Sequence, residues 1–81
     1  MAITIYVKVF ATLVRHMPGV SAGAPFEIEL PAGATVQTLV ERLELPQDEV
    51  KVVFVNGRAR PADWMLAAGD EVGIFPPIGG G

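Results

Sequence analysis

The sequence predicts an α+β domain, in which a mixed sheet of four to five strands packs on one main helix and a C-terminal tail projects from the end. Three observations lead to this prediction. Short segments of alternating polar and apolar residues occur on both sides of a single segment with helical periodicity. One helix suffices to cover one face of a sheet, because each has a single apolar face to bury. The chain ends in prolines and glycines, which favour neither element.

Two strands are expected before the helix. The segment from Ile3 to Phe10 alternates, and so does the segment from Phe26 to Leu30. Between them, Ala11 to Gly23 is rich in turn residues and is predicted to be a loop that opens with a helical turn. The two strands are therefore expected to pair antiparallel. The residues expected to face the core are Ile3, Ile5, Val7, Val9, Phe26, Ile28 and Leu30.

The helix is expected over Val36 to Leu43, where apolar residues recur at helical spacing. Thr35 precedes it and is a suitable N-cap, because its hydroxyl can accept a hydrogen bond from the first turn. Thr38 stands where a capping box would have Glu or Gln, so we expect only partial capping. Pro46 is expected to end the helix.

The second half of the chain returns to strands. Val50 to Val55 is predicted to be the third strand, and Asn56-Gly57 a tight turn into a short edge segment, Arg58 to Arg60. A turn of helix is expected at Asp63 to Leu66, with Trp64 and Leu66 packing inward. Glu71 to Phe75 is the last predicted strand.

Composition excludes several classes of function. The net charge of −3 disfavours nucleic acid and anionic membranes as partners. The chain has no cysteine and one histidine, His16, so we expect no disulfide, no thiol nucleophile and no metal site. No bound cofactor is expected either. There is no apolar run of about 20 residues and no signal-like segment, and we therefore expect a cytoplasmic protein.

The 81 residues suffice for one domain, which we place at residues 1–75, with a flexible tail at 76–81. An extended tail of this length could reach about 20 Å. Its glycines lack Cβ atoms and can enter a narrow channel. A terminal carboxylate becomes reactive when a partner enzyme activates it with ATP as an acyl-adenylate. The acyl group can then accept sulfur, giving a thiocarboxylate, or an amine, giving an isopeptide.

Several motifs resemble the MoaD/ThiS family of sulfur carriers over essentially the whole chain. They are the β-β-α-β-β order, the VNGR turn at Val55 to Arg58, the AGDEV segment at Ala68 to Val72, and the FPPIGGG ending at Phe75 to Gly81. The length and the FPP ending look more like MoaD, the small subunit of molybdopterin synthase. The chain has Leu13-Val14-Arg15-His16 where many MoaD proteins carry an Arg-Glu pair, which leaves another sulfur acceptor open.

The resemblance implies a ubiquitin-like β-grasp fold and a carrier function without enzymatic activity of its own. An E1-like enzyme would use ATP to adenylate Gly81, which would then carry sulfur as a thiocarboxylate to a larger synthase subunit of the MoaE type. Gly79 and Gly80 would allow the tail to thread into these partners. The implied pathway is molybdopterin, the organic part of the molybdenum cofactor.

Other assignments stay open at the level of sequence. Phe75 either closes the core or docks partners, and Ile78 is expected to dock them. Arg58 and Arg60 either pair with acidic groups of a partner or form a solvated hairpin. The alternative functions are a ubiquitin-like modifier conjugated to lysines, a carrier for thiamine, tRNA thiolation or another acceptor, and a passive interaction module.

Overall fold

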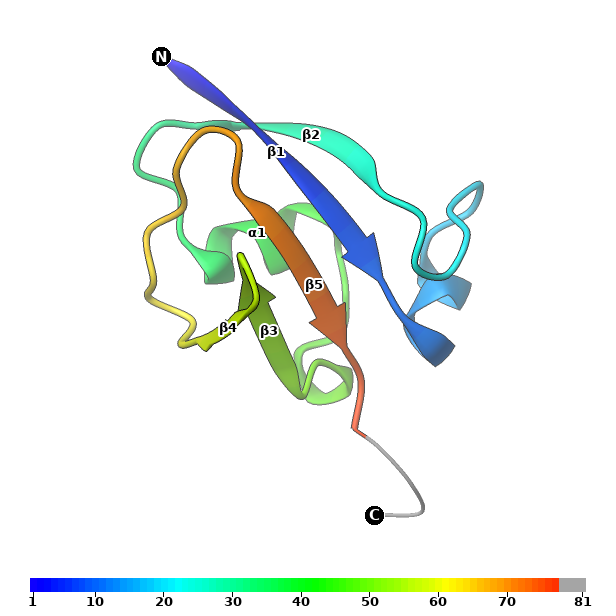
Figure 1. Cartoon of the computed structure of the whole chain (residues 1–81). Helices are drawn as coiled ribbons and strands as arrows, with labels where there is room; N and C mark the ends of the chain where they lie inside the picture. Colours follow the sequence, from blue (N-terminus) through cyan, green and yellow to red (C-terminus); the bar gives the residue numbers. More distant parts are fainter. Residues whose placement is uncertain (78–81) are drawn as a thin grey trace.

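A computed structural model describes residues 1–77 and confirms the α+β prediction (Figure 1). One mixed sheet contains five strands in the order β2-β1-β5-β3-β4. The strands are β1 (Ala2–Val9), β2 (Phe26–Pro31), β3 (Val52–Val55), β4 (Arg58–Arg60) and β5 (Glu71–Phe75). The helical segments are the α-helix α1 (Val36–Arg42) and two 3-10 helices, η1 (Ala11–His16) and η2 (Gln47–Glu49).

The directions of the strands decide where β5 ends and the tail begins. β1 pairs antiparallel with β2, as predicted, and parallel with β5, while β3 pairs antiparallel with both β5 and β4. Val9 lies opposite Ile74, so the parallel strands β1 and β5 finish at the same end of the sheet. The chain leaves the sheet there, next to the start of β3, where the Lys51 N–H donates to the Phe75 carbonyl at 2.8 Å (Figure 1).

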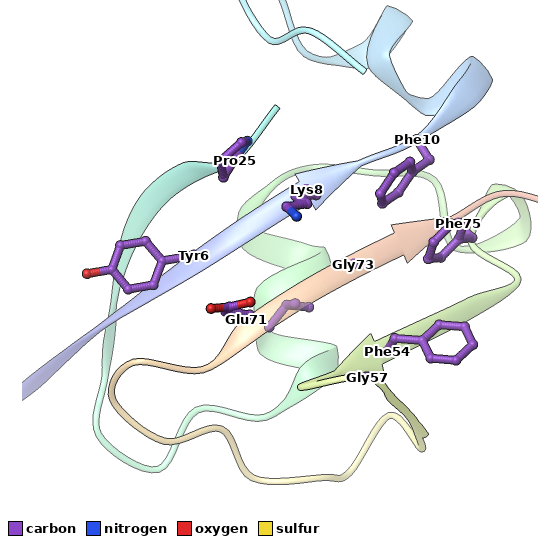
Figure 2. A pocket seen from close by; sticks show the side chains of 10 residues that line it. Tyr6, Lys8, Phe10, Pro25, Phe54, Gly57, Glu71, Gly73 and Phe75 are labelled. Carbon is purple, nitrogen blue, oxygen red and sulfur yellow. The ribbon is translucent and has the colours of Figure 1, made fainter. Parts of the chain in front are cut away.

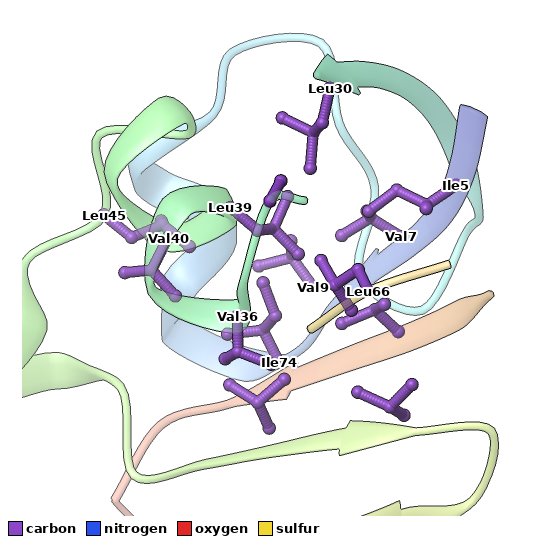
Figure 3. Packing of buried hydrophobic residues seen from close by; sticks show 14 of the residues in the cluster. Ile5, Val7, Val9, Leu30, Val36, Leu39, Val40, Leu45, Leu66 and Ile74 are labelled. Carbon is purple, nitrogen blue, oxygen red and sulfur yellow. The ribbon is translucent and has the colours of Figure 1, made fainter. Parts of the chain in front are cut away.

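The core lies between the sheet and α1 (Figure 3). Ile5, Val7 and Val9 alternate toward the helix and are fully buried, as the sequence predicted. Leu39 of α1 and Ile74 of β5 meet them from the helix and from the neighbouring strand. Within residues 1–77 no polar or charged residue is buried. Burying each such aliphatic side chain contributes about 1.5–3 kcal/mol before conformational entropy is subtracted.

The start of α1 is capped more fully than expected. The Thr38 N–H donates to the Thr35 hydroxyl at 3.2 Å, and the Thr35 N–H donates to the Thr38 hydroxyl at 3.1 Å. A threonine therefore replaces the usual Glu or Gln of a capping box, and the prediction of partial capping was wrong. The helix ends at Arg42, before the predicted Leu43. Glu44 adopts a left-handed φ of 58°, so the helix ends ahead of Pro46.

The segment after β4 corrects a second prediction. No helix forms at Asp63 to Leu66, because this backbone pairs with the residues before α1. The Val36 N–H donates to the Trp64 carbonyl at 3.0 Å, and the Leu66 N–H donates to the Ala34 carbonyl at 2.8 Å. Leu66 is buried as predicted, but Trp64 is 37% exposed and does not belong to the core.

The remaining connections between the strands match the predictions from the sequence in part. The predicted helical turn after β1 is the 3-10 helix η1. The third strand begins at Val52, because η2, which was not predicted, extends to Glu49. Asn56 and Gly57 form the predicted tight turn with φ of 52° and 85°, a left-handed backbone that Asn and Gly tolerate. No helix in the described part of the chain has the length and apolar character to cross a bilayer.

Candidate functional site: the open sheet face and the base of the tail

The base of the tail is fixed by the sheet. Phe75 ends β5, and its carbonyl accepts the Lys51 hydrogen bond described above. Pro76 is buried and Pro77 is exposed, so the chain reaches the surface between these two residues. The predicted docking residue Ile78 and the three glycines Gly79, Gly80 and Gly81 lie outside the described residues. Their roles remain predictions.

Three phenylalanines gather on the sheet face opposite α1 (Figure 2). The rings of Phe10 and Phe75 are stacked, with centroids 4.3 Å apart and planes 3° from parallel. Phe54 meets the Phe75 ring edge-on at 5.5 Å and 78°. Phe75 is half-buried and points away from the helix-facing core. Its role in docking partners stays a prediction.

A glycine allows the stacked pair to lie flat on β5. A Cβ atom at Gly73 would be 3.3 Å from Cε1 of Phe75 and 3.5 Å from Cε2 of Phe10. The first distance is tighter than ordinary van der Waals contact, so a side chain there would push the Phe75 ring outward. Gly73 therefore leaves room for the aromatic cluster at the point where β5 approaches the tail.

The cluster borders a hollow of about 620 Å³ on the open sheet face. Tyr6, Lys8 and Glu71 line the same hollow and extend it away from the tail (Figure 2). Most of its lining is aromatic or aliphatic, and Lys8 and Glu71 are its charged side chains. An exposed apolar surface with a polar border is typical of a protein-binding site. The open sheet face is therefore suited to docking a partner.

A small polar cluster joins η1 to η2 near the same end of the sheet. Glu49 accepts hydrogen bonds at one oxygen, Oε1, from His16 Nε2 at 3.0 Å and from Arg15 Nη2 at 3.1 Å. The His16 hydrogen bond, aided by Arg15, lowers the pKa of the Glu49 carboxyl from its ordinary value of 4.5. Residues 1–77 contain no group of His, Asp and Glu side chains arranged to hold a metal ion.

The structure separates the residues that the sequence grouped as candidate docking residues. Arg58 and Arg60 lie opposite Val55 and Val53, whose side chains point into the core. Both arginines are therefore on the helix side of the sheet, whereas Phe75 is on the open face. Arg60 stacks over Trp64, with its Cζ 4.0 Å from the ring centroid.

Phe10, Phe54 and Gly73 were not predicted from the sequence to be parts of a site. A signal was present, because the alternation of the first strand puts Tyr6, Lys8 and Phe10 opposite the buried residues. What the sequence could not give was the parallel pairing of β1 with β5. That pairing brings Phe10 beside Phe75.

Comparison with known proteins identifies the family. The sequence model of the ThiS family matches residues 7–81, so the chain belongs to the ThiS family. The resemblance to the ubiquitin-like MoaD/ThiS carriers is thereby confirmed, and members of this family are small carrier proteins rather than catalysts. None of the curated proteins matches the chain.

Solved structures give the same fold. A Pyrococcus furiosus protein described as molybdopterin converting factor, subunit 1, is 34% identical, with a TM-score of 0.74 over 94% of this chain and 99% of that one. SAMP1 from Haloferax volcanii is 26% identical, with a TM-score of 0.68 over 96% and 99%. The Caldiarchaeum subterraneum ubiquitin is 22% identical, with a TM-score of 0.62 over both whole chains. The fold is thus a ubiquitin-like β-grasp.

Proposed function

We propose that the chain is a sulfur carrier whose acyl group is the terminal carboxylate of Gly81. The carboxylate attacks the α-phosphorus of ATP on an E1-like enzyme, and pyrophosphate leaves. Sulfide, as HS⁻, then attacks the acyl carbon, AMP leaves, and the glycine becomes a thiocarboxylate. The membership of the ThiS family carries this proposal. The position of the tail, which follows directly from β5 at the border of an open aromatic face, supports it.

Residues 1–75 form the folded carrier in this proposal, and residues 76–81 form the arm that delivers the acyl group. The arm starts from a fixed point, because Pro76 is buried and the Phe75 carbonyl is bonded to the start of β3. From there an extended arm reaches about 20 Å. Gly79 and Gly80 let the backbone of a partner approach closely, because they have no Cβ atoms.

The open sheet face is the proposed docking surface for two successive partners, the E1-like enzyme and a larger synthase subunit of the MoaE type. Phe75 belongs both to this face and to the end of β5, so a partner bound to the aromatic cluster has the tail at its border. Ile78 would extend the same apolar contact. The sulfur acceptor in this proposal is a molybdopterin precursor, supported by the identity of 34% to the Pyrococcus furiosus protein. Thiamine and tRNA thiolation are the alternative acceptors.

A second function is favoured by the likeness to SAMP1. Another Haloferax volcanii structure with the same fold is that of small archaeal modifier protein 1. In that function the activated Gly81 is attacked by a lysine amine of a target protein, and an isopeptide forms. Both functions use the same activation step. Lysine conjugates in a cell extract would distinguish the modifier from the carrier.

Two tail variants test the shared requirement for a free Gly81 carboxylate. One lacks Gly80 and Gly81, and the other carries an alanine added after Gly81. Both are expected to fold and to lose sulfur transfer completely. The matched control carries the added alanine before Met1, which is fully exposed, and should keep full activity. Sulfur transfer by the variant extended after Gly81 would contradict both acyl-transfer functions.

A further inference from the structure

A second surface lies at the edge strand β4 and on the segment that follows it. We call this surface the edge patch and define it as Arg58, Arg60, Trp64 and Met65. These residues line a hollow of about 270 Å³ between β4 and the segment leading to β5. Trp64 is 37% exposed and Met65 is 64% exposed, so two large apolar side chains face solvent beside two arginines. β4 and β2 form the two opposite edges of the sheet (Figure 1).

The indole of Trp64 holds the Arg60 guanidinium in place. Cζ of Arg60 lies 4.0 Å from the ring centroid, a cation–π contact that restricts the plane of the guanidinium. Its Nε is buried and has no hydrogen-bond partner. Within residues 1–77 neither Arg58 nor Arg60 forms an ion pair. Each guanidinium has five N–H donors, so the edge patch presents two cations whose acceptors must come from water or a partner.

Two acidic residues lie near the edge patch, and within residues 1–77 neither forms an ion pair with its arginines. Asp70 borders the hollow, but Oδ1 accepts from Asn56 Nδ2 at 2.9 Å and Oδ2 from the Ala67 N–H at 2.8 Å. Its carboxylate is therefore committed to the turn before β5. Asp63 lies on the segment after β4 and is exposed. In the described residues the edge patch thus keeps two guanidinium groups without an ion-pair partner, on a chain whose net charge is −3.

Charge complementarity selects the partner among three kinds. A second copy paired edge-to-edge through β4 would bring arginines against arginines, which is unfavourable. A nucleic acid would meet only two arginines on an acidic protein, too few to neutralise a run of phosphates. An acidic protein segment fits both features, because its carboxylates can pair with the guanidinium groups and an apolar side chain can cover Trp64 and Met65.

We propose that the edge patch is a second docking surface, which binds an acidic protein segment with apolar residues next to its carboxylates. The arginines lie on the helix side of the sheet and the aromatic cluster on the other side. One partner can therefore hold the edge patch while another holds the open sheet face and the tail. This proposal does not depend on the chemistry of Gly81.

Trp64 reports directly on this binding, because it is the single tryptophan of the chain. The full chain is titrated with a short capped peptide of alternating glutamate and leucine, and Trp64 fluorescence and backbone amide shifts are followed. We expect a fluorescence change and shifts confined to residues 55–70, both weakened by added salt. Arg58→Glu should weaken binding about three- to tenfold, since each exposed ion pair contributes up to about 1 kcal/mol and reversal adds repulsion.

The matched control is Arg42→Glu, which makes the same charge change at another exposed arginine, in the last turn of α1. It should bind the peptide as the native chain does. Equal weakening by both variants, shifts centred on the open sheet face, or no binding at all would overturn the proposal. Tighter binding of a single-stranded oligonucleotide than of the peptide, at the same residues, would also overturn it. Thiocarboxylation of Arg58→Glu should be unchanged, which keeps this test separate from the proposed carrier function.

Discussion

The stack of Phe10 on Phe75 should contribute a measurable coupling energy to folding. Phe75 makes two aromatic contacts, the parallel stack at 4.3 Å and the edge contact with Phe54 at 5.5 Å. Each such pair contributes about 0.5–1.5 kcal/mol beyond its buried area, so the two together contribute about 1–3 kcal/mol. A fully buried phenylalanine costs about 3–5 kcal/mol when changed to alanine. For the half-buried Phe75 we expect Phe75→Ala to lower the free energy of unfolding by about 2–4 kcal/mol.

A double-mutant cycle isolates the stack from the other contacts. The variants Phe10→Ala, Phe75→Ala and the double variant are unfolded in urea and followed by circular dichroism. The double variant should lose less stability than the sum of the single variants, by about 0.5–1.5 kcal/mol. The control cycle combines Phe75→Ala with Thr38→Ala on α1, on the other side of the sheet, where the losses should add. Additivity within about 0.3 kcal/mol in the Phe10 cycle would refute the stacking argument.

Three further changes probe the rest of the structure. Thr38→Ala removes one half of the capping box at Thr35 and should cost about 0.5–2 kcal/mol in urea unfolding, whereas no measurable loss would mean that the box does not act. Leu39→Ala empties a fully buried position and should cost about 2–5 kcal/mol by the same method, and a smaller loss would place Leu39 outside the core. Because the pKa of Glu49 is lowered in the folded chain, its ionised carboxylate stabilises the fold above pH 4.5, and this contribution disappears as the pH falls through the lowered pKa. The melting temperature of Glu49→Gln should therefore lie below that of the native chain near neutral pH and meet it in acid, and a gap that persists in acid would contradict the pKa argument.

Much of the fold could be predicted from the sequence, because local patterns determined it. The alternation from Ile5 to Val9 and the helical spacing from Val36 to Val40 are both reproduced in the buried positions. The Asn56-Gly57 turn needed only the backbone preferences of its two residues. In each of these cases the residues that decide the structure are neighbours in the chain.

The errors share a different physical cause. Asp63 to Leu66 was predicted to be helical from its own residues, but its backbone bonds to Ala34 and Val36, far away in the sequence. Trp64 was predicted to pack inward, whereas it packs against Arg60 at the edge of the sheet. In both cases contacts that are distant in sequence decided the outcome.

The candidate site was predictable only in part for the same reason. The sequence pointed to the tail and to Phe75, and the ThiS family match agrees with the general carrier assignment. The partners of Phe75 on the open sheet face required the order of strands, which puts β5 between β1 and β3. The register of β4 on β3 also puts Arg58 and Arg60 on the face of the sheet opposite Phe75, which the spacing of residues along the chain could not show.

Intact mass spectrometry tests the central proposal most directly. The chain is incubated with ATP, an E1-like activating enzyme and a sulfur donor, and the mass of the whole chain and of its terminal peptide is measured. The proposal predicts a gain equal to the replacement of one oxygen by one sulfur, located on the peptide that ends at Gly81. No gain, from an activating enzyme that thiolates another carrier in the same mixture, would contradict the assignment of this chain as a sulfur carrier.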